Sequence, residues 1–168
     1  MKIGILGGSF DPAHKGHLAI SKEARKRFKL EKIIWAITKK NPLKAQSKTP
    51  ISKKIKDCKK IIGLNSFIKA KFYENIIKSN KTIDLINYLK KNKNIEIFFL
   101  MGADNLITFH KWHKSKLISQ KCNIIVFDRH GYKKNSLKSK TFMRLNNKTL
   151  TFVEFKKVNI SSSQLRKI

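Results

Sequence analysis

Short apolar runs alternate with helical segments along the whole chain, and this alternation constrains the fold more than any other feature. The runs Ile33–Ile37 and Ile97–Met101 are apolar at every position, so strands built from them would be buried on both faces. We expect strands at 2–6, 32–37, 67–73, 95–101, 123–128 and 150–155, and helical segments at 16–28, 51–63, 82–91 and within 103–119. This order predicts one α/β domain over residues 1–168, a doubly wound parallel sheet covered by helices.

Composition indicates a globular intracellular protein. The 168 residues are enough for one domain with a substantial core, and 40% of them are hydrophobic. No apolar stretch approaches the roughly 20 residues that a membrane-spanning helix needs. The N-terminus lacks the form of a signal peptide, because Gly7 and Gly8 interrupt its short apolar run. Cys58 and Cys122 are too few for a disulfide framework, so we expect a cytoplasmic location.

The net charge of +29 raises the possibility of a nucleic-acid partner. Only five of the 39 basic residues are arginine, and the lysines are spread over the whole chain. A dedicated nucleic-acid surface more often uses arginine, which binds phosphate through two nitrogens, together with interleaved aromatic residues. We therefore expect no nucleic-acid partner, although a basic nucleic-acid-binding module remains the alternative class of function.

The loop after the first expected strand carries the strongest chemical signal. Gly7 and Gly8 allow a ligand to approach the backbone closely, and His14 and His17 follow around Gly16. If a helix begins near residue 14, both imidazoles lie on one face of its first turn and can bind an anion beside the free backbone N–H groups. The alternatives are two surface histidines or part of a metal site, for which no third ligand is evident.

A second cluster follows the strand expected at 95–101. Asp104 comes directly after the strand and could accept hydrogen bonds from ribose hydroxyls. Trp112 offers a flat face on which an electron-poor ring could stack, and its polar neighbours His110, Lys111 and His113 favour partial exposure. The alternative is that Trp112 is an ordinary core aromatic.

A third cluster lies near the C-terminus. Ser161, Ser162 and Ser163 can begin a helical turn, and Arg166 follows at a spacing that places it near the same backbone N–H groups. This arrangement is typical of an anion site, although an ordinary capped helix would have the same sequence. Ligands of doubly wound sheets bind where the carboxyl ends of the strands meet, so we expect the first two clusters to lie at that edge.

The loop Gly7–His17, read as GGSFDPAHKGH, resembles the signature of the HxGH nucleotidylyltransferases, and its form is similar to that of nicotinate-nucleotide adenylyltransferases. The segments 102–106 (GADNL) and 109–112 (FHKW) also resemble this narrower family, as does 160–166 (ISSSQLR), where Ser163 stands for a threonine. The resemblance implies a Rossmann-like fold. It also implies transfer of the adenylyl group of ATP to nicotinate mononucleotide, which gives deamido-NAD and pyrophosphate in NAD biosynthesis.

The resemblance further implies a role for individual residues. The catalytic residues would be His14, His17 and Arg166. The ATP-binding residues would be Gly7, Gly8, Ser9, Phe10, Gly16, Gly102, Asp104, Ile160, Ser161 and Ser162. The mononucleotide-binding residues would be Lys44, Thr82, Trp112 and Arg129, of which Thr82 could instead be a plain helix cap. A Mg²⁺ ion would be held mainly through the phosphates, with no dedicated protein site.

The chain departs from the family pattern in several places. It ends two residues after Arg166, where many members continue into a further helix, so we expect less support for the final motif. Residues 127–131 (FDRHG) replace the usual Arg-Pro-Gly, and the segment after Pro50 carries lysines where members often have an arginine. Residues 133–148 form either a surface excursion or a mobile lid. The acceptor could also be nicotinamide mononucleotide or, more remotely, pantetheine phosphate.

Overall fold

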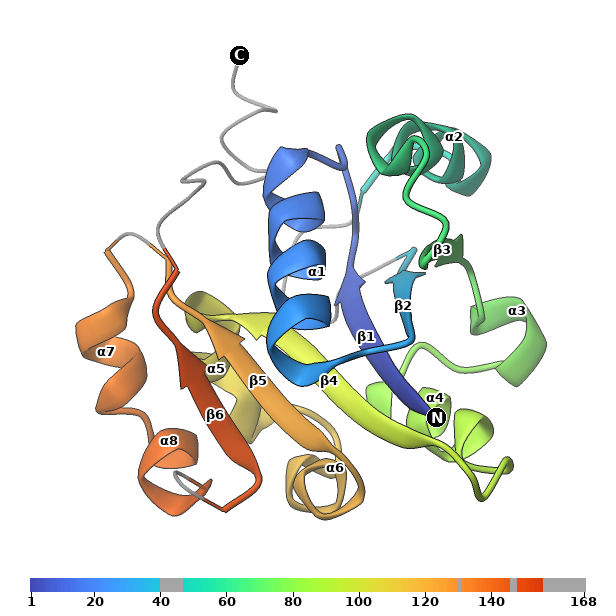
Figure 1. The fold of residues 1–168 in the computed structure, drawn as a ribbon. Helices are drawn as coiled ribbons and strands as arrows, with labels where there is room; N and C mark the ends of the chain where they lie inside the picture. Colours follow the sequence, from blue (N-terminus) through green and yellow to red (C-terminus); the bar gives the residue numbers. More distant parts are fainter. Residues whose placement is uncertain (40–46, 130, 146–147, 156–168) are drawn as a thin grey trace.

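Six parallel strands form one sheet at the centre of the molecule (Figure 1). The computed structural model describes residues 1–39, 47–129, 131–145 and 148–155. The strand order is β3-β2-β1-β4-β5-β6. The strands are β1 (Lys2–Gly8), β2 (Lys32–Ile37), β3 (Ile68–Lys71), β4 (Glu96–Gly102), β5 (Asn123–Phe127) and β6 (Leu150–Val153).

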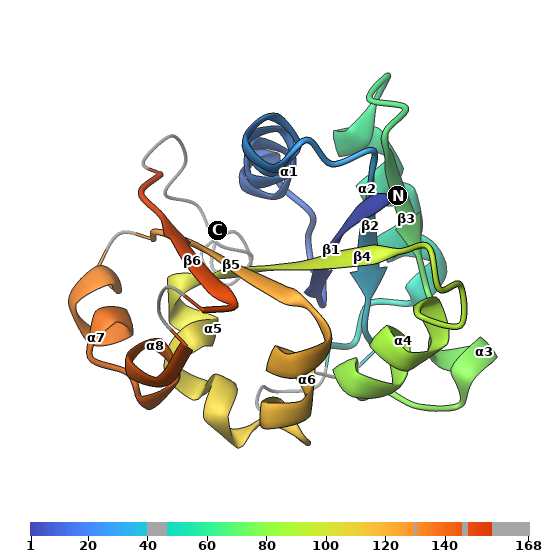
Figure 2. The same cartoon turned by 60° about the horizontal axis from the view of Figure 1, so that its bottom comes forward.

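Helices cover both faces of this sheet, as Figures 1 and 2 show. One face packs against α1 (Lys15–Phe28) and α2 (Ile51–Ile62). The other face packs against α4 (Thr82–Leu89), α5 (Ala103–Thr108), α6 (Ser115–Lys121) and α8 (Lys140–Leu145). The remaining helical pieces are α3 (Glu74–Ile77), the 3₁₀ turn η1 (Phe109–Lys111) and α7 (Lys133–Leu137).

Alternate residues of each central strand enter opposite cores. In β4, Phe99 and Met101 join the core under α4–α6, whereas Phe98 and Leu100 join the core under α1 and α2. All four are at least 94% buried, which explains why these runs are apolar at every position. The expected doubly wound parallel sheet is therefore confirmed.

The direction of winding reverses between β1 and β4. From β1 the chain runs outward through β2 to β3, and it then returns to pair β4 with the other side of β1. The loops after β1 and β4 diverge at their carboxyl ends and leave a crevice there, which is where ligands bind in sheets of this type. Both loops carry residues that the sequence identified as candidates.

Two segments differ from the expectation. Residues 133–148 contain α7 and α8, and the buried residues Ser136, Thr141 and Leu145 fix these helices against the rest of the fold. The described part of the segment, 133–145, is therefore packed against the domain and is not a plain surface excursion. The short helix α3 was not expected, because four residues are too few for a periodic pattern.

A buried polar link fixes α1 to the sheet. Ser21, which is fully buried in α1, accepts a hydrogen bond from Nε1 of Trp35 at 2.8 Å and donates one to the carbonyl of His17 at 2.8 Å. Trp35 lies in β2 and is also fully buried, so its indole N–H depends on this serine for a partner.

We predict that Ser21→Ala lowers the free energy of unfolding by about 1–3 kcal/mol, because it leaves the buried indole N–H of Trp35 without a partner. Urea denaturation of the variant measures this loss. Ser52→Ala, at an exposed position of α2, corrects for the helix propensity gained with alanine. Equal midpoints for the two variants would contradict the assigned role of Ser21.

Candidate active site

Two histidines close the first turn of α1 by capping it reciprocally. Nδ1 of His14 accepts a hydrogen bond from the backbone N–H of Gly16 at 3.1 Å. Nδ1 of His17 accepts one from the backbone N–H of His14, also at 3.1 Å. Such a capping box normally uses serine or threonine with glutamate or glutamine, so histidine at both positions is unusual. The caps bring the two imidazole centres to 3.9 Å from each other.

The same caps determine which ring nitrogen carries the proton. An Nδ1 atom that accepts an N–H cannot itself be protonated, so in the neutral ring the proton is on Nε2. Burial, and secondarily the charge of Arg129, lowers the pKa of His14 to about 4. Burial and the neighbouring His14 hold the pKa of His17 well below its usual value. Both residues are therefore neutral Nε2–H donors at pH 7, and Nε2 of the buried His14 has no hydrogen-bond partner.

Aromatic side chains pack against His17 on the side that faces the core. Phe10 is 1% exposed, and its ring lies 4.6 Å from that of His17 and stacks on Trp35 at 5.2 Å. Phe10 also has a positive φ of 47°, which turns the chain sharply between β1 and α1. The structure therefore places Phe10, expected to bind ATP, in the core beneath the histidines.

The first loop is also tied to the chain that follows β2. The carboxylate of Asp11 accepts hydrogen bonds from the Ser47 hydroxyl at 2.5 Å and from the Thr49 hydroxyl at 2.6 Å. On the same side, Lys54 of α2 is 1% exposed, and its Nζ donates to the carbonyl of Thr38 at 3.2 Å. These hydrogen bonds fix the side of the crevice that lies next to α2.

The segments after β4 and β5 bring a carboxylate, from Asp104, and a guanidinium, from Arg129, next to the histidines. Nη1 of Arg129 lies 2.8 Å from Oδ2 of Asp104, whereas the buried Oδ1 of Asp104 has no partner and remains able to accept a hydrogen bond. A side chain at position 102 would meet Oδ1 of Asp104 at 2.6 Å, so Gly102 is what allows the carboxylate this position. The charge of Arg129 also acts on both imidazoles, which places the pair beside the first loop.

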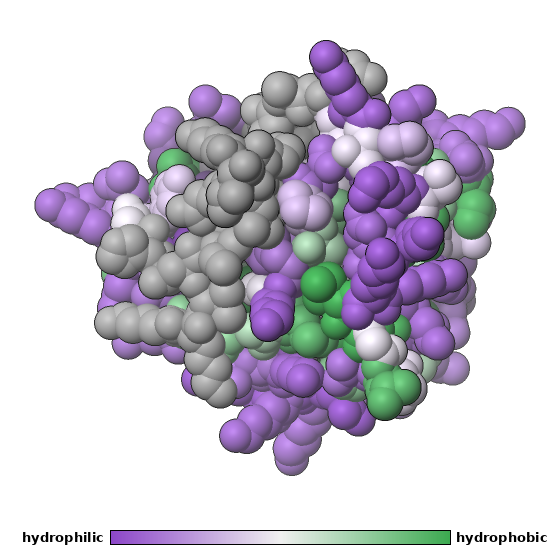
Figure 3. Space-filling model, turned by 90° about the horizontal axis from the view of Figure 1, so that it is seen from above, coloured by the Kyte–Doolittle hydropathy of each residue, from purple (hydrophilic) through white to green (hydrophobic). Residues whose placement is uncertain are grey.

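A pocket opens at the carboxyl edge of the sheet, next to the histidine loop. It is lined by Ile5, Gly7, Gly8, Ser9, Ala36, Ile37, Thr38, Tyr73, Glu74, Ile77, Ser79, Asn80, Lys81, Thr82, Leu85, Phe99, Asn105, Trp112, His113 and Ile118. Seen from this edge, hydrophobic residues occupy a hollow with hydrophilic residues around it (Figure 3). An apolar floor with polar groups at its rim is typical of a site for a small organic ligand.

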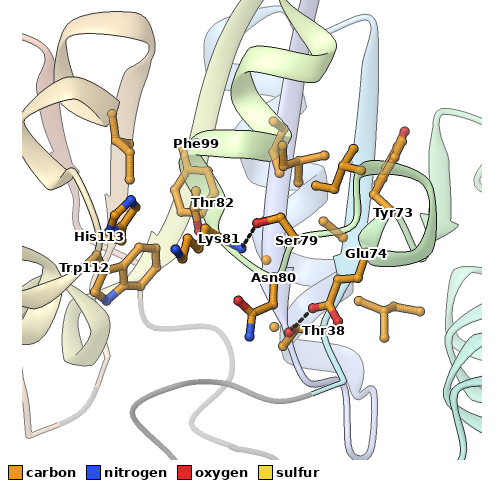
Figure 4. Close-up of a pocket in the computed structure, with 18 of the residues that line it drawn as sticks. Thr38, Tyr73, Glu74, Ser79, Asn80, Lys81, Thr82, Phe99, Trp112 and His113 are labelled. Atoms are coloured by element: carbon orange, nitrogen blue, oxygen red, sulfur yellow. Dashed lines mark hydrogen bonds between the residues drawn. The ribbon is translucent and has the colours of Figure 1, made fainter.

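Trp112 forms one wall of this pocket (Figure 4). Its ring makes a perpendicular contact with Phe99 at 5.9 Å and a tilted one with Phe109 at 5.2 Å, which fixes its orientation from behind. The side chain is only partly buried, so it also faces the pocket, as its polar neighbours predicted. Thr82, at the start of α4, lies close to it in the lining.

Apart from Phe10, which lies in the core, the expected site residues fall into three groups. Gly7, Gly8, Ser9, Thr82 and Trp112 line the pocket. His14, Gly16, His17, Gly102, Asp104 and Arg129 lie at the starts of α1 and α5 and at the end of β5, outside the pocket lining. The structure thus pairs Arg129, expected to bind the mononucleotide, with Asp104. Lys44, Ile160, Ser161, Ser162 and Arg166 lie outside the described residues.

Several lining residues were not anticipated. Thr38 directly follows β2 at the carboxyl edge, a position that could have identified it. Glu74 and Lys81 lie in the segment between β3 and α4, where an isolated charged residue resembles any surface residue. Lys54, which is buried but is not part of the pocket lining, was missed as well, because a lysine on an otherwise apolar helix face is expected to reach solvent.

In the described part of the chain, no three His, Cys, Asp or Glu side chains are grouped closely enough to hold a metal ion. Over the same residues, no helix has the length and apolar character required to cross a bilayer. Cys58 and Cys122 are free and buried, and burial raises the pKa of each thiol to about 12.

Fold and site together define a Rossmann-like nucleotide-binding domain with paired neutral imidazoles at its switch point. Residues 5–168 match the model of the cytidylyltransferase-like family. The chain is 67% identical, over 99% of its length and 93% of the relative, to a protein of Pelagibacter ubique (strain HTCC1062) named "Probable nicotinate-nucleotide adenylyltransferase". It is 36% identical to a protein of the same name from Bradyrhizobium sp. (strain ORS 278), over 77% of this chain and 68% of the relative. The chain belongs to the nicotinate-nucleotide adenylyltransferases within the cytidylyltransferase-like family.

Solved structures agree with the fold. The chain superimposes on a Plasmodium falciparum nicotinic acid mononucleotide adenylyltransferase complexed with NaAD, with a TM-score of 0.80 at 22% identity. The match covers 99% of this chain and 82% of that structure. A second structure of the Plasmodium falciparum enzyme, complexed with APC, gives a TM-score of 0.79 at 23% identity, over 99% of this chain and 82% of that one.

The lowered pKa of His14 predicts a loss of stability in acid. Between about pH 6.5 and 4 the unfolded chain binds a proton at this residue and the folded chain does not, so the free energy of unfolding falls as the pH falls. One such group contributes at most about 1.4 kcal/mol per pH unit. His14→Asn keeps a capping side chain but removes the titration, so urea midpoints of the variant should fall less between pH 6.5 and 4.5. Parallel pH curves for the two proteins would contradict the assignment.

Proposed function

We propose that this chain transfers the adenylyl group of ATP to nicotinate mononucleotide, giving deamido-NAD and pyrophosphate. The observation that carries the proposal is the position of two neutral Nε2–H donors beside a pocket with an aromatic wall. The donors suit the phosphates of ATP, and the pocket suits the pyridine ring of the acceptor. The 67% identity to a relative of that name supports the same assignment.

The reaction needs orientation and charge stabilisation more than proton transfer. An oxygen of the acceptor 5′-phosphate attacks the α-phosphorus of ATP, and the bond from that phosphorus to the bridging oxygen of pyrophosphate breaks. The attacking phosphate is already ionised near pH 7, so no general base is required. Catalysis then depends on holding the two phosphates in line and on stabilising the charge that develops on the leaving group.

We assign to His14 and His17 the stabilisation of that charge at the α- and β-phosphates. Their Nε2–H groups are fixed by the caps on Nδ1 before the substrate arrives, so little reorganisation is needed during the reaction. Arg129 adds a positive charge nearby, and the free Oδ1 of Asp104 can accept a ribose hydroxyl of ATP. We assign the distal phosphates to Ser161, Ser162 and Arg166, on the motif resemblance alone.

We also propose that Mg²⁺ takes part, coordinated mainly by phosphate oxygens and water. The described residues provide no acidic cluster for it, and Mg²⁺ commonly binds nucleotide phosphates with few protein ligands. The ion would neutralise phosphate charge. We place the reaction in the cytoplasm, a reducing compartment compatible with the free thiols of Cys58 and Cys122.

The experiment that tests this function is pyrophosphate release from ATP and Mg²⁺ with nicotinate mononucleotide, with the dinucleotide product identified by mass. Release that depends on the mononucleotide is expected. ATP hydrolysis without dinucleotide, or no release at all, would refute the proposed function. Binding of oligonucleotides at physiological ionic strength would favour a nucleic-acid-binding module instead.

Replacement of His17 should lower kcat far more than it changes the affinity for the mononucleotide. We expect a loss of about 100-fold or more in kcat for His17→Ala, because removal of one preorganised donor commonly has this effect. His17→Gln can keep the cap on the His14 N–H, so it separates helix capping from catalysis. If the glutamine variant retained the wild-type kcat, the role of the imidazole would be refuted.

Replacement of Trp112 should affect binding of the mononucleotide. We expect Trp112→Ala to raise its KM about tenfold, since stacking of a base on an aromatic side chain contributes roughly 1–3 kcal/mol. Trp112→Phe retains an aromatic face and should raise KM less. A KM that is unchanged in the alanine variant would assign Trp112 to the core alone.

A further inference from the structure

Two side chains with full charges line the pocket, and they lie on opposite sides of it. Figure 4 shows Glu74 next to Thr38 on one side and Lys81 on the other, near Thr82 and Trp112. The other described lining residues are apolar or uncharged at pH 7, apart from the titratable His113. The pocket is therefore polarised, with its positive side at the wall that Trp112 forms.

Glu74 is held in place by its neighbours. Its carboxylate accepts a hydrogen bond from the hydroxyl of Thr38 and one from the backbone N–H of Lys39 at 3.4 Å. Both donors directly follow β2, so the negative charge is fixed at that side. A ligand carboxylate would be repelled from this side of the pocket.

The backbone of Lys81 is held by hydrogen bonds, and its side chain is exposed. Its N–H donates to the Ser79 hydroxyl at 3.1 Å, and its carbonyl accepts from the N–H of Asp84 at 3.1 Å at the start of α4. The Ser79 hydroxyl also donates to the Asp84 carboxylate at 2.5 Å, which closes the turn. None of the ion pairs found in the described part of the chain uses the Lys81 ammonium.

We propose that Lys81 is the residue that selects the acid over the amide, by pairing its ammonium group with the carboxylate on the pyridine ring. The proposal rests on the function proposed above and specifies how that function discriminates between nicotinate and nicotinamide mononucleotides. A ring stacked on Trp112 brings its substituent to the side of Lys81 and keeps it away from Glu74.

Charge explains why the discrimination favours the acid. A carboxylate that enters a partly apolar hollow loses water and needs a positive partner, whereas a neutral carboxamide does not. Loss of the ammonium should therefore weaken binding of the acid and leave binding of the amide almost unchanged. Arginine at the same position would retain the charge.

The test is equilibrium binding of each mononucleotide without ATP, followed by tryptophan fluorescence or calorimetry. For Lys81→Met we expect the Kd of nicotinate mononucleotide to rise about five- to tenfold, and that of nicotinamide mononucleotide to change less than about twofold. Lys81→Arg should retain most of the preference. Lys93→Met removes the same charge from an exposed turn at the opposite end of the sheet and should change neither value.

An acid-to-amide preference that is unchanged in Lys81→Met would overturn the proposal, as would a wild-type protein that binds both nucleotides equally or binds neither. These outcomes are read from binding of the mononucleotides without ATP, so they do not require the protein to catalyse the reaction. Failure of the proposed function is seen separately, as absence of dinucleotide formation by the wild type with either acceptor. The side chain of Lys81 makes no capping hydrogen bond, so the methionine variant should fold normally, which an unchanged melting temperature would verify.

Discussion

The reciprocal cap between His14 and His17 is the interaction on which the rest of the site depends. It satisfies backbone N–H groups at the start of α1 and also fixes the position, the tautomer and the charge of two imidazoles. A serine and glutamate box would cap the helix equally well but would place no N–H donors in the crevice. Because Nδ1 is committed to the backbone, Nε2 is the atom left to meet a ligand. The helix cap and the candidate phosphate site are therefore one structure.

The sheet topology brings the remaining parts to the same place. Since β1 pairs with both β2 and β4, the residues after these strands converge on one edge. On one side of the switch point the Asp104–Arg129 pair lies beside the histidines, and on the other the pocket extends towards Trp112. ATP and an acceptor mononucleotide bound in these two places would meet at the first loop. The geometry thus suits a reaction that joins two nucleotides.

The sequence predicted the strands, the sheet type and the position of the first loop well, because these depend on apolar periodicity and on glycine and histidine at fixed spacing. It predicted charged residues poorly. Lys54 is buried with its ammonium on a backbone carbonyl, and Glu74 and Lys81 face the pocket, yet each appears in the sequence as one of many polar surface residues. The helices within 133–145 were missed for a related reason: in a segment rich in lysine, a few buried residues such as Leu145 are enough to pack two short helices against the domain.

The protonation state of His14 and His17 tests the central claim most directly. Long-range ¹H–¹⁵N correlation spectra of the ligand-free protein at pH 6, assigned with His14→Asn and His17→Gln, distinguish neutral tautomers from imidazolium. The caps and the lowered pKa values predict two neutral rings with the proton on Nε2 and a bare Nδ1. Imidazolium signals for either ring at pH 6, or a proton on Nδ1, would contradict the account.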